Sequence, residues 1–200
     1  MPQPKAMFSI ADFQATLQHR QPFMATIDGF RPSAVLLPIL RGPDEDFVLL
    51  TRRTEKVEHH KGQISFPGGR QDPGESILAC VLRETYEEVG VAAETIQILG
   101  RLDDTWTPTR YIITPFVGVL PSTVKLTANP EEIAELLIIP LSQLLCPDKY
   151  EENEMTHFGQ SAVVPFFYVG STIIWGATAR ILRQFLQLAF QWEAKPCESY

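Results

Sequence analysis

The chain has 200 residues, which is enough for one domain with a substantial core but hardly enough for two full domains. Hydrophobic residues make up 44% and charged residues 20%, as in ordinary soluble globular proteins. With 17 basic against 24 acidic residues, the net charge is −7, and no basic face for nucleic acid is expected. Small anionic substrates are still allowed, because a bound metal ion inverts the local field.

Three widely spaced cysteines, Cys80, Cys146 and Cys197, form no CxxC pair. This argues against a disulfide framework or a structural zinc site and favours a reduced compartment. Residues 1–20 lack the basic stretch and apolar run of a secretory signal, so we expect a cytoplasmic protein. Residues 158–179 carry no charge but are interrupted by glycine and proline, which predicts two buried strands and a turn rather than a membrane span.

The first predicted element is a helix at residues 10–20, which Ser9 can cap. It falls in a region, residues 1–30, that we expect to be a helical extension packed on a single domain formed by residues 31–195.

A hairpin follows, with strands at residues 34–40 and 47–51 around a turn at 42–46. Pro38 inside the first strand favours an edge position or a bulge, since proline has no N–H to give to a ladder. A short strand is expected at residues 64–66.

The clearest helix covers residues 76–89 and ends at Gly90. Strands are expected at 96–102 and 112–120. The remaining elements are an ambiguous apolar run at 133–139, a helical turn at 141–145, strands at 163–169 and 172–175, and an amphipathic helix at 177–192 that presents Ile181, Leu182, Phe185, Leu188 and Ala189 on one face. This mixture predicts an α/β or α+β domain.

Three carboxylates gather on the helix at 76–89. At about 100° per residue, Glu84, Glu87 and Glu88 fall within roughly 100° of arc. A different arc, expected to face the core, carries Leu78, Leu82, Thr85 and Val89.

This acidic arc is unfavourable on its own. Each like-charged pair costs about 0.2–0.5 kcal/mol, and anions near a helix C-terminus oppose the macrodipole. Arg83 can pair with Glu87, but one arginine does not neutralise three carboxylates. A divalent cation would neutralise the three carboxylates, and hard oxygen ligands at this spacing suit Mg²⁺ or Mn²⁺. The plainer alternative is a solvated acidic face; the tight loop upstream, with Gly69 and Glu75, favours the metal.

Residues 69–91 read GRQDPGESILACVLRETYEEVGV. They resemble the Nudix box: Gly, five residues, Glu, seven residues, Arg-Glu, an aliphatic, any residue, Glu-Glu, any residue, Gly, an aliphatic. The matching residues are Gly69, Glu75, Arg83, Glu84, Glu87, Glu88, Gly90 and Val91, whereas Thr85 departs from the aliphatic position.

The resemblance implies an α/β/α sandwich around a mixed β-sheet, with the box as a loop–helix–loop motif. It also implies metal-dependent hydrolysis of a pyrophosphate linkage in a small nucleotide substrate. Arg83 then orients the carboxylates, and the metal ligands are Glu84, Glu87 and Glu88, with Glu75 close by and the carbonyl of Gly69.

Residues 49–69 read LLTRRTEKVEHHKGQISFPGG and are similar to the signature before the box in coenzyme A pyrophosphatases. Thr54 stands where that signature has Ser or Ala, and Glu58 stands where it has Arg. The resemblance implies hydrolysis of coenzyme A or acyl-CoA to 3′,5′-ADP and (acyl-)4′-phosphopantetheine. Residues 175–180 resemble this branch more weakly. The residues in register are Leu49, Leu50, Thr51, Arg53, Gly62, Phe66, Pro67, Gly68 and Gly69.

Glu58 reverses a charge of the signature and therefore keeps two alternatives open. One is a Nudix pyrophosphatase for ADP-ribose, another dinucleotide or a nucleoside triphosphate. The other is a non-catalytic module that senses a nucleotide, which would be expected to have lost box carboxylates. The oligomeric state is also open, with a homodimer as one alternative.

Further candidates lie outside the helix. Glu132 is a candidate general base, with a turn or cap residue as the alternative, and Asp103 and Asp104 are weaker candidates. His59 and His60 would point apart in an extended segment and are poor joint metal ligands. For Trp106, Tyr111 and Cys80, packing is favoured over a functional role. The candidate substrate-binding residues are Arg53, Lys61, Phe66 and Arg70.

Overall fold

The structure is a computed structural model that describes residues 6–55, 62–157 and 160–193. The elements in chain order are α1 (Ile10–Gln18), β1 (Arg31–Leu40), β2 (Phe47–Arg53), β3 (Ile64–Ser65), β4 (Gly68–Arg70), α2 (Ile77–Val89), a 3₁₀ turn η1 (Ala93–Thr95), β5 (Gln97–Arg101), β6 (Thr105–Trp106), β7 (Tyr111–Leu120), β8 (Ile133–Pro140), α3 (Leu141–Leu144), a 3₁₀ turn η2 (Pro147–Lys149), β9 (Tyr150–His157), β10 (Gln160–Val169), β11 (Thr172–Trp175) and α4 (Gly176–Phe190).

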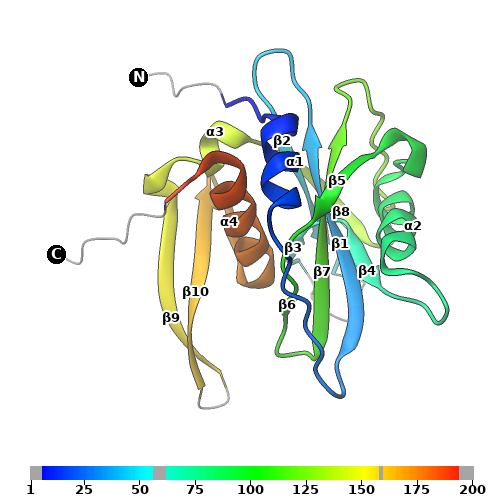
Figure 1. The fold of residues 1–200 in the computed structure, drawn as a ribbon, viewed down its shortest axis with the longest axis vertical. Coiled ribbons are helices and arrows are strands. Elements are labelled where there is room, and N and C mark those ends of the chain that lie inside the picture. Colours follow the sequence, from blue (N-terminus) through cyan, green and yellow to red (C-terminus); the bar gives the residue numbers. More distant parts are fainter. Residues whose placement is uncertain (1–5, 56–61, 158–159, 194–200) are drawn as a thin grey trace.

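A mixed sheet stands between helices, as Figure 1 shows. Helix α2 covers one face, and α1 and α4 cover the other, so the expected α/β/α sandwich is confirmed. A second sheet of order β11-β10-β9 packs on the far side of α4. Each face of the main sheet buries its own apolar cluster, and the larger cluster joins the sheet to α1 and α4.

Strand β1 is central, which makes the edge position expected from Pro38 wrong. It pairs in parallel with β7 and antiparallel with β4 and β2. On the β4 and β2 side, Leu36 donates its N–H to the carbonyl of Pro67 (2.8 Å), and backbone alternation turns the nitrogen of Pro38 to the same side. On this side β4 pairs with β1 only as far as Val35, and the pairing of β2 with β1 begins at Ile39. The N–H that Pro38 lacks would therefore point into the gap between the two partner strands.

Helix α2 begins and ends as its sequence predicts. The side chain of Ser76 accepts a hydrogen bond from the N–H of Ala79 (3.1 Å), and Gly90 ends the helix with φ 72°. The expected core stripe is only partly right, because Leu78 is 38% exposed. The face that packs on the sheet instead carries Cys80, Val81, Thr85, Glu88 and Val89.

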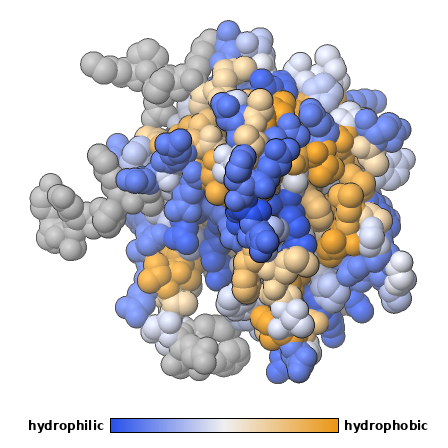
Figure 2. Space-filling model, viewed as in Figure 1, coloured by the Kyte–Doolittle hydropathy of each residue, from blue (hydrophilic) through white to orange (hydrophobic). Residues whose placement is uncertain are grey.

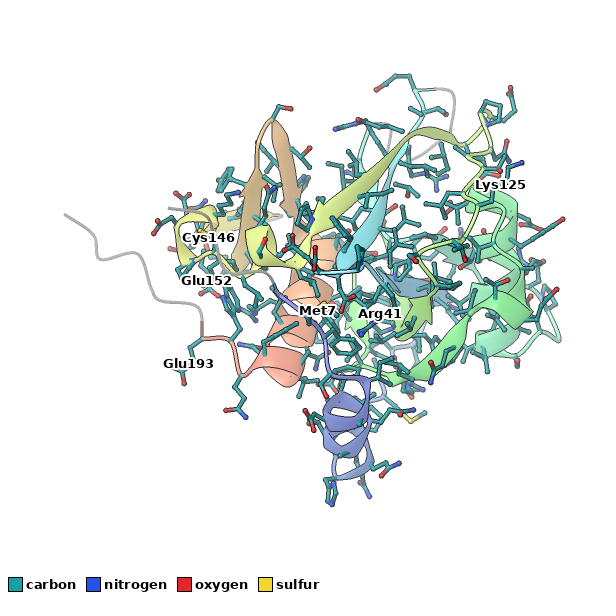
Figure 3. All side chains as sticks on the ribbon, turned by 90° about the horizontal axis from the view of Figure 1, so that it is seen from above. Met7, Arg41, Lys125, Cys146, Glu152 and Glu193 are labelled. Carbon is teal, nitrogen blue, oxygen red and sulfur yellow. The ribbon has the colours of Figure 1, made fainter. Side chains whose placement is uncertain are left out.

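The N-terminal segment is anchored to α4 and β5. Phe8 and Phe13 are buried and contact Phe185 ring to ring, with centroids 5.5 Å apart in each pair. Arg41 donates to the carbonyl of Phe8 (2.7 Å), and Figure 3 shows Arg41 close to Met7 in the view from above. The proposed division between residues 1–30 and 31–195 stays a prediction.

We expect the Phe13→Ala variant to lower the free energy of unfolding by about 3–5 kcal/mol, because a buried ring would leave a cavity between α1 and α4. Urea unfolding followed by circular dichroism measures this. Met24→Ala is the control, since Met24 is 66% exposed, and it should change stability by less than about 0.5 kcal/mol. Equal losses in both variants would show that α1 does not share the core.

Most predicted strands are confirmed, including the ambiguous run that becomes β8. Strands β4, β6 and β9 were not predicted. Strand β9 reads YEENEMTH, and its polar side chains hide the strand pattern. In the three described ranges, no helix is long and apolar enough to cross a membrane. The face shown in Figure 2 is mainly hydrophilic, with apolar side chains in separate patches.

Candidate functional site

Arg83, in the middle of α2, gathers the acidic residues of the motif. Its Nε and Nη2 donate to the two carboxylate oxygens of Glu75, each at 3.0 Å. Its Nη1 donates to Glu84 (2.9 Å) and Glu87 (3.1 Å), and Nη2 also reaches the carbonyl of Arg70 (3.2 Å). This fork holds loop and helix carboxylates together. The hydrogen bond from Arg83 is the main cause that lowers the pKa of Glu75.

Glu88 is the buried member of the cluster, with only 1% of its surface exposed. It accepts hydrogen bonds from the N–H of Gly68 and from Nη1 of Arg53, both at 3.1 Å. Burial raises the pKa of Glu88 to about 8; the charges of Glu84 and Glu132 add to this, and the two hydrogen bonds oppose it. The second carboxylate oxygen accepts from the N–H of Gly68, and a nearby cation would stabilise the ionised form.

Glu84 lies directly against the backbone of Gly69. A Cβ added at Gly69 would stand 2.4 Å from the carboxylate carbon of Glu84 and 2.5 Å from both its oxygens. Glycine is therefore required here for the carboxylate to occupy its position. Burial is the main cause that raises the pKa of Glu84, and the charges of Glu87 and Glu132 add to it.

Glu132 reaches the same cluster from the turn before β8. One of its carboxylate oxygens lies 3.9 Å from Nη2 of Arg53, and the side chain is 39% exposed. Its charge acts on both Glu84 and Glu88, which places it in the same electrostatic cluster. The sequence placed this residue before the later strand, and the structure brings it next to the box carboxylates.

The residues of the box fit a divalent metal ion by their chemistry. Glu84, Glu87 and Glu88 supply hard oxygen donors, with Arg83 bonded to the first two and Arg53 to the third. The glycine at position 69 leaves room for the Glu84 carboxylate beside a backbone carbonyl. Within residues 6–55, 62–157 and 160–193, no three acidic, His or Cys side chains converge as they would around an ion. Glu84 and Glu87 both bond the same Nη1 of Arg83.

Several other candidates have structural partners instead. Phe66 is 1% exposed and packs in the core, away from any surface that a substrate could reach. Asp103 pairs with Arg20 and accepts from the N–H of Phe23 (2.7 Å), so it anchors the N-terminal segment. Asp104 likewise accepts from the N–H of Ala25 (3.0 Å) and pairs with a neighbouring arginine.

The favoured packing interpretation agrees with the surroundings of Cys80, whereas Trp106 is 47% exposed. Cys80 is fully buried, and burial raises the pKa of its thiol to about 11, which disfavours the thiolate form. Trp106 packs near Phe23, with ring centroids 6.4 Å apart. Arg70 is exposed and pairs with Ser33 of β1. Among the candidates, Glu58, His59, His60, Lys61 and Cys197 lie outside the described residues.

Two threonines at which the sequence departs from the motifs take part in the site's architecture. The hydroxyl of Thr85, at the departing position of the box, donates to the carbonyl of Val81 (2.6 Å), so a buried threonine is satisfied where an aliphatic was expected. Thr54 holds the turn that carries Glu132. Its conservative difference from the signature gave no sign of this contact.

Comparison with known proteins agrees with this geometry. A family model described as NUDIX domain matches residues 29–159. The chain is 39% identical over 184 residues to "Uncharacterized Nudix hydrolase NudL" of Photorhabdus laumondii, covering 90% of this chain and 98% of the relative. It is 37% identical over 172 residues to the protein of the same name in Yersinia pestis, covering 86% and 84%.

Among solved structures, a MutT NUDIX hydrolase from Burkholderia pseudomallei superposes with a TM-score of 0.50 at 19% identity, over 78% of this chain and 98% of that one. This likeness shows the fold. The family model and the relatives show the family, and every carboxylate of the box is present. The chain therefore belongs to the Nudix hydrolase family and is a pyrophosphohydrolase.

Proposed function

We propose that this pyrophosphohydrolase cleaves coenzyme A or acyl-CoA to 3′,5′-ADP and (acyl-)4′-phosphopantetheine. The observation that carries the proposal is the signature at residues 49–69. Two of its groups, the guanidinium of Arg53 and the N–H of Gly68, hold the same buried carboxylate of Glu88. These two hydrogen bonds join the signature directly to the box helix. A substitution in the signature that changes the substrate class would therefore also alter the position of a box carboxylate.

We assign the metal ligands to Glu84, Glu87 and Glu88, with the carbonyl of Gly69 completing the set and Glu75 beside it. When bound, Mg²⁺ or Mn²⁺ polarises phosphoryl oxygens and lowers the pKa of coordinated water. Arg83 orients the carboxylates through its fork. Its paired hydrogen bonds to Glu75 fix the loop before α2 against the helix.

Glu132 is proposed as the general base that takes a proton from the attacking water. It is partly exposed, at the rim of the carboxylate cluster, so it can meet both solvent and substrate. The guanidinium of Arg53 lies between Glu132 and Glu88, bonded to Glu88 at 3.1 Å and only loosely paired with Glu132 at 3.9 Å.

Arg53, Arg70 and Lys61 are proposed to contact the phosphates of the substrate. Arg70 follows Gly69 on β4 and is exposed, so its side chain is accessible to a ligand. A cytoplasmic location and a homodimer belong to the same proposal. Light scattering and fractionation test these two points separately from the chemistry.

Phosphorus NMR of reactions with coenzyme A, acyl-CoA, ADP-ribose and a nucleoside triphosphate, each with Mg²⁺ or Mn²⁺, tests the substrate. We expect release of 3′,5′-ADP from coenzyme A or its thioester, with slower turnover of the others. Turnover of ADP-ribose or the triphosphate alone would retain the Nudix chemistry and overturn the coenzyme A assignment. Glu58 would then be the first position to change to arginine.

A further inference from the structure

Thr54 fixes the turn that carries Glu132 from the side of β2. This threonine follows β2 and is 8% exposed. Its N–H donates to the carbonyl of Glu132 (2.8 Å), and its hydroxyl donates to the carbonyl of Glu131 (3.0 Å). Two successive peptide groups of the turn are therefore held by one residue.

The same turn is fixed from the side of α2 by Asn129. Its N–H donates to the carbonyl of Glu88 (2.9 Å), at the last turn of the box helix. Its side-chain oxygen accepts from the N–H of Glu131 (3.1 Å). The N–H groups of Glu132 (3.1 Å) and Ile133 (2.8 Å) close back on its carbonyl. The turn is thus clamped between the signature strand and the catalytic helix.

We propose that Thr54 is a positioning residue that sets the location of Glu132 over the box carboxylates through its hydroxyl. The inference rests on the proposed function, in which Glu132 is the general base. Every residue except proline would keep the N–H bond from position 54 to Glu132, so the hydroxyl is the contact that depends on the choice of side chain. A serine would retain it, whereas alanine or valine would release the peptide between Glu131 and Glu132.

The geometry explains why such a contact matters for catalysis. The side chain of Glu132 is held by Arg53 only at 3.9 Å, a loose ion pair for an exposed carboxylate. Its placement therefore depends on its backbone. Reaction rates are sensitive to displacements of about 1 Å in the reacting groups. Release of the turn is therefore expected to lower the turnover rate more than it lowers substrate affinity.

A double-mutant cycle on the full chain tests the inference. We expect Thr54→Val to lower kcat by about five- to tenfold with KM within about twofold, and Thr54→Ser to stay within about twofold of wild type. In the Glu132→Gln background, Thr54→Val should have no further effect on kcat. Glu135→Gln, three residues further along and paired with Arg52, is the matched control and should retain wild-type kcat.

Each outcome has one meaning. Equal losses from Thr54→Val in the wild-type and Glu132→Gln backgrounds would overturn the positioning role, because the threonine would then act independently of Glu132. Wild-type kcat in Glu132→Gln would instead overturn the base assignment of the proposed function. Thermal unfolding accompanies each variant, and Thr54→Ala, which has the alternative residue of the signature, replaces Thr54→Val if the latter does not fold. Wild-type kcat in Thr54→Ala would also overturn the inference.

Discussion

The Glu88→Gln variant is expected to lose about 10²–10⁴ in kcat/KM, because the change would remove one of the proposed anionic metal ligands and with it several kcal/mol of transition-state stabilisation. The substitution keeps the size of the side chain and an oxygen that can accept from the N–H of Gly68. The initial rate of product release with saturating Mg²⁺ measures the loss. Glu94→Gln, at an exposed position after the helix, is the control and should retain wild-type activity.

The loss in Glu88→Gln should not come from unfolding. Burial and two neighbouring carboxylates raise the pKa of Glu88 to about 8, so a neutral group at this position relieves repulsion in the metal-free protein. We expect the variant to unfold at the same temperature as wild type or higher without metal. Added Mn²⁺ should raise the unfolding temperature of wild type more than that of the variant. An equal metal-induced shift in both proteins would contradict the role of Glu88 as a ligand.

The sequence predicted the secondary structure of the site better than the burial of its side chains. Helix α2 has a serine cap, a terminal glycine and a long box motif, so its limits and its acidic face follow from local rules. The burial of Glu88 does not follow from local rules, because helical spacing alone places Glu87 and Glu88 on the same arc. The sheet packs against one side of that arc, leaving Glu88 1% exposed and the side chain of Glu87 49% exposed.

Long-range contacts were the other limit of prediction. A central strand can contain Pro38 because β4 pairs with β1 only before this residue and β2 only after it, which no local sequence pattern shows. The bond from Thr54 to the carbonyl of Glu131 joins residues 77 positions apart, and no local pattern marks it. Strand β9 was missed because polar residues form it at the edge of a separate sheet.

The second large effect is expected from Gly69→Ala, with a loss of about 100-fold in kcat. The new methyl group would overlap the carboxylate of Glu84, whose atoms lie 2.4–2.5 Å from the Cβ position. The end of a flexible side chain can move aside, so the free energy of unfolding should change by less than about 1 kcal/mol. The carbonyl of residue 69 is retained, and the loss therefore reports on the position of Glu84.

Gly68→Ala is the matched comparison, one residue earlier in β4. Here φ is 149°, and the Cβ position lies 2.2 Å from the carbonyl oxygen of Ala34 and 2.6 Å from the Cα of Val35. Backbone atoms do not move aside, so the free energy of unfolding should fall by about 3 kcal/mol or more. Urea unfolding and initial rates on both variants separate the two effects. Wild-type turnover in folded Gly69→Ala would show that catalysis does not require the carboxylate of Glu84 at the place the structure gives it.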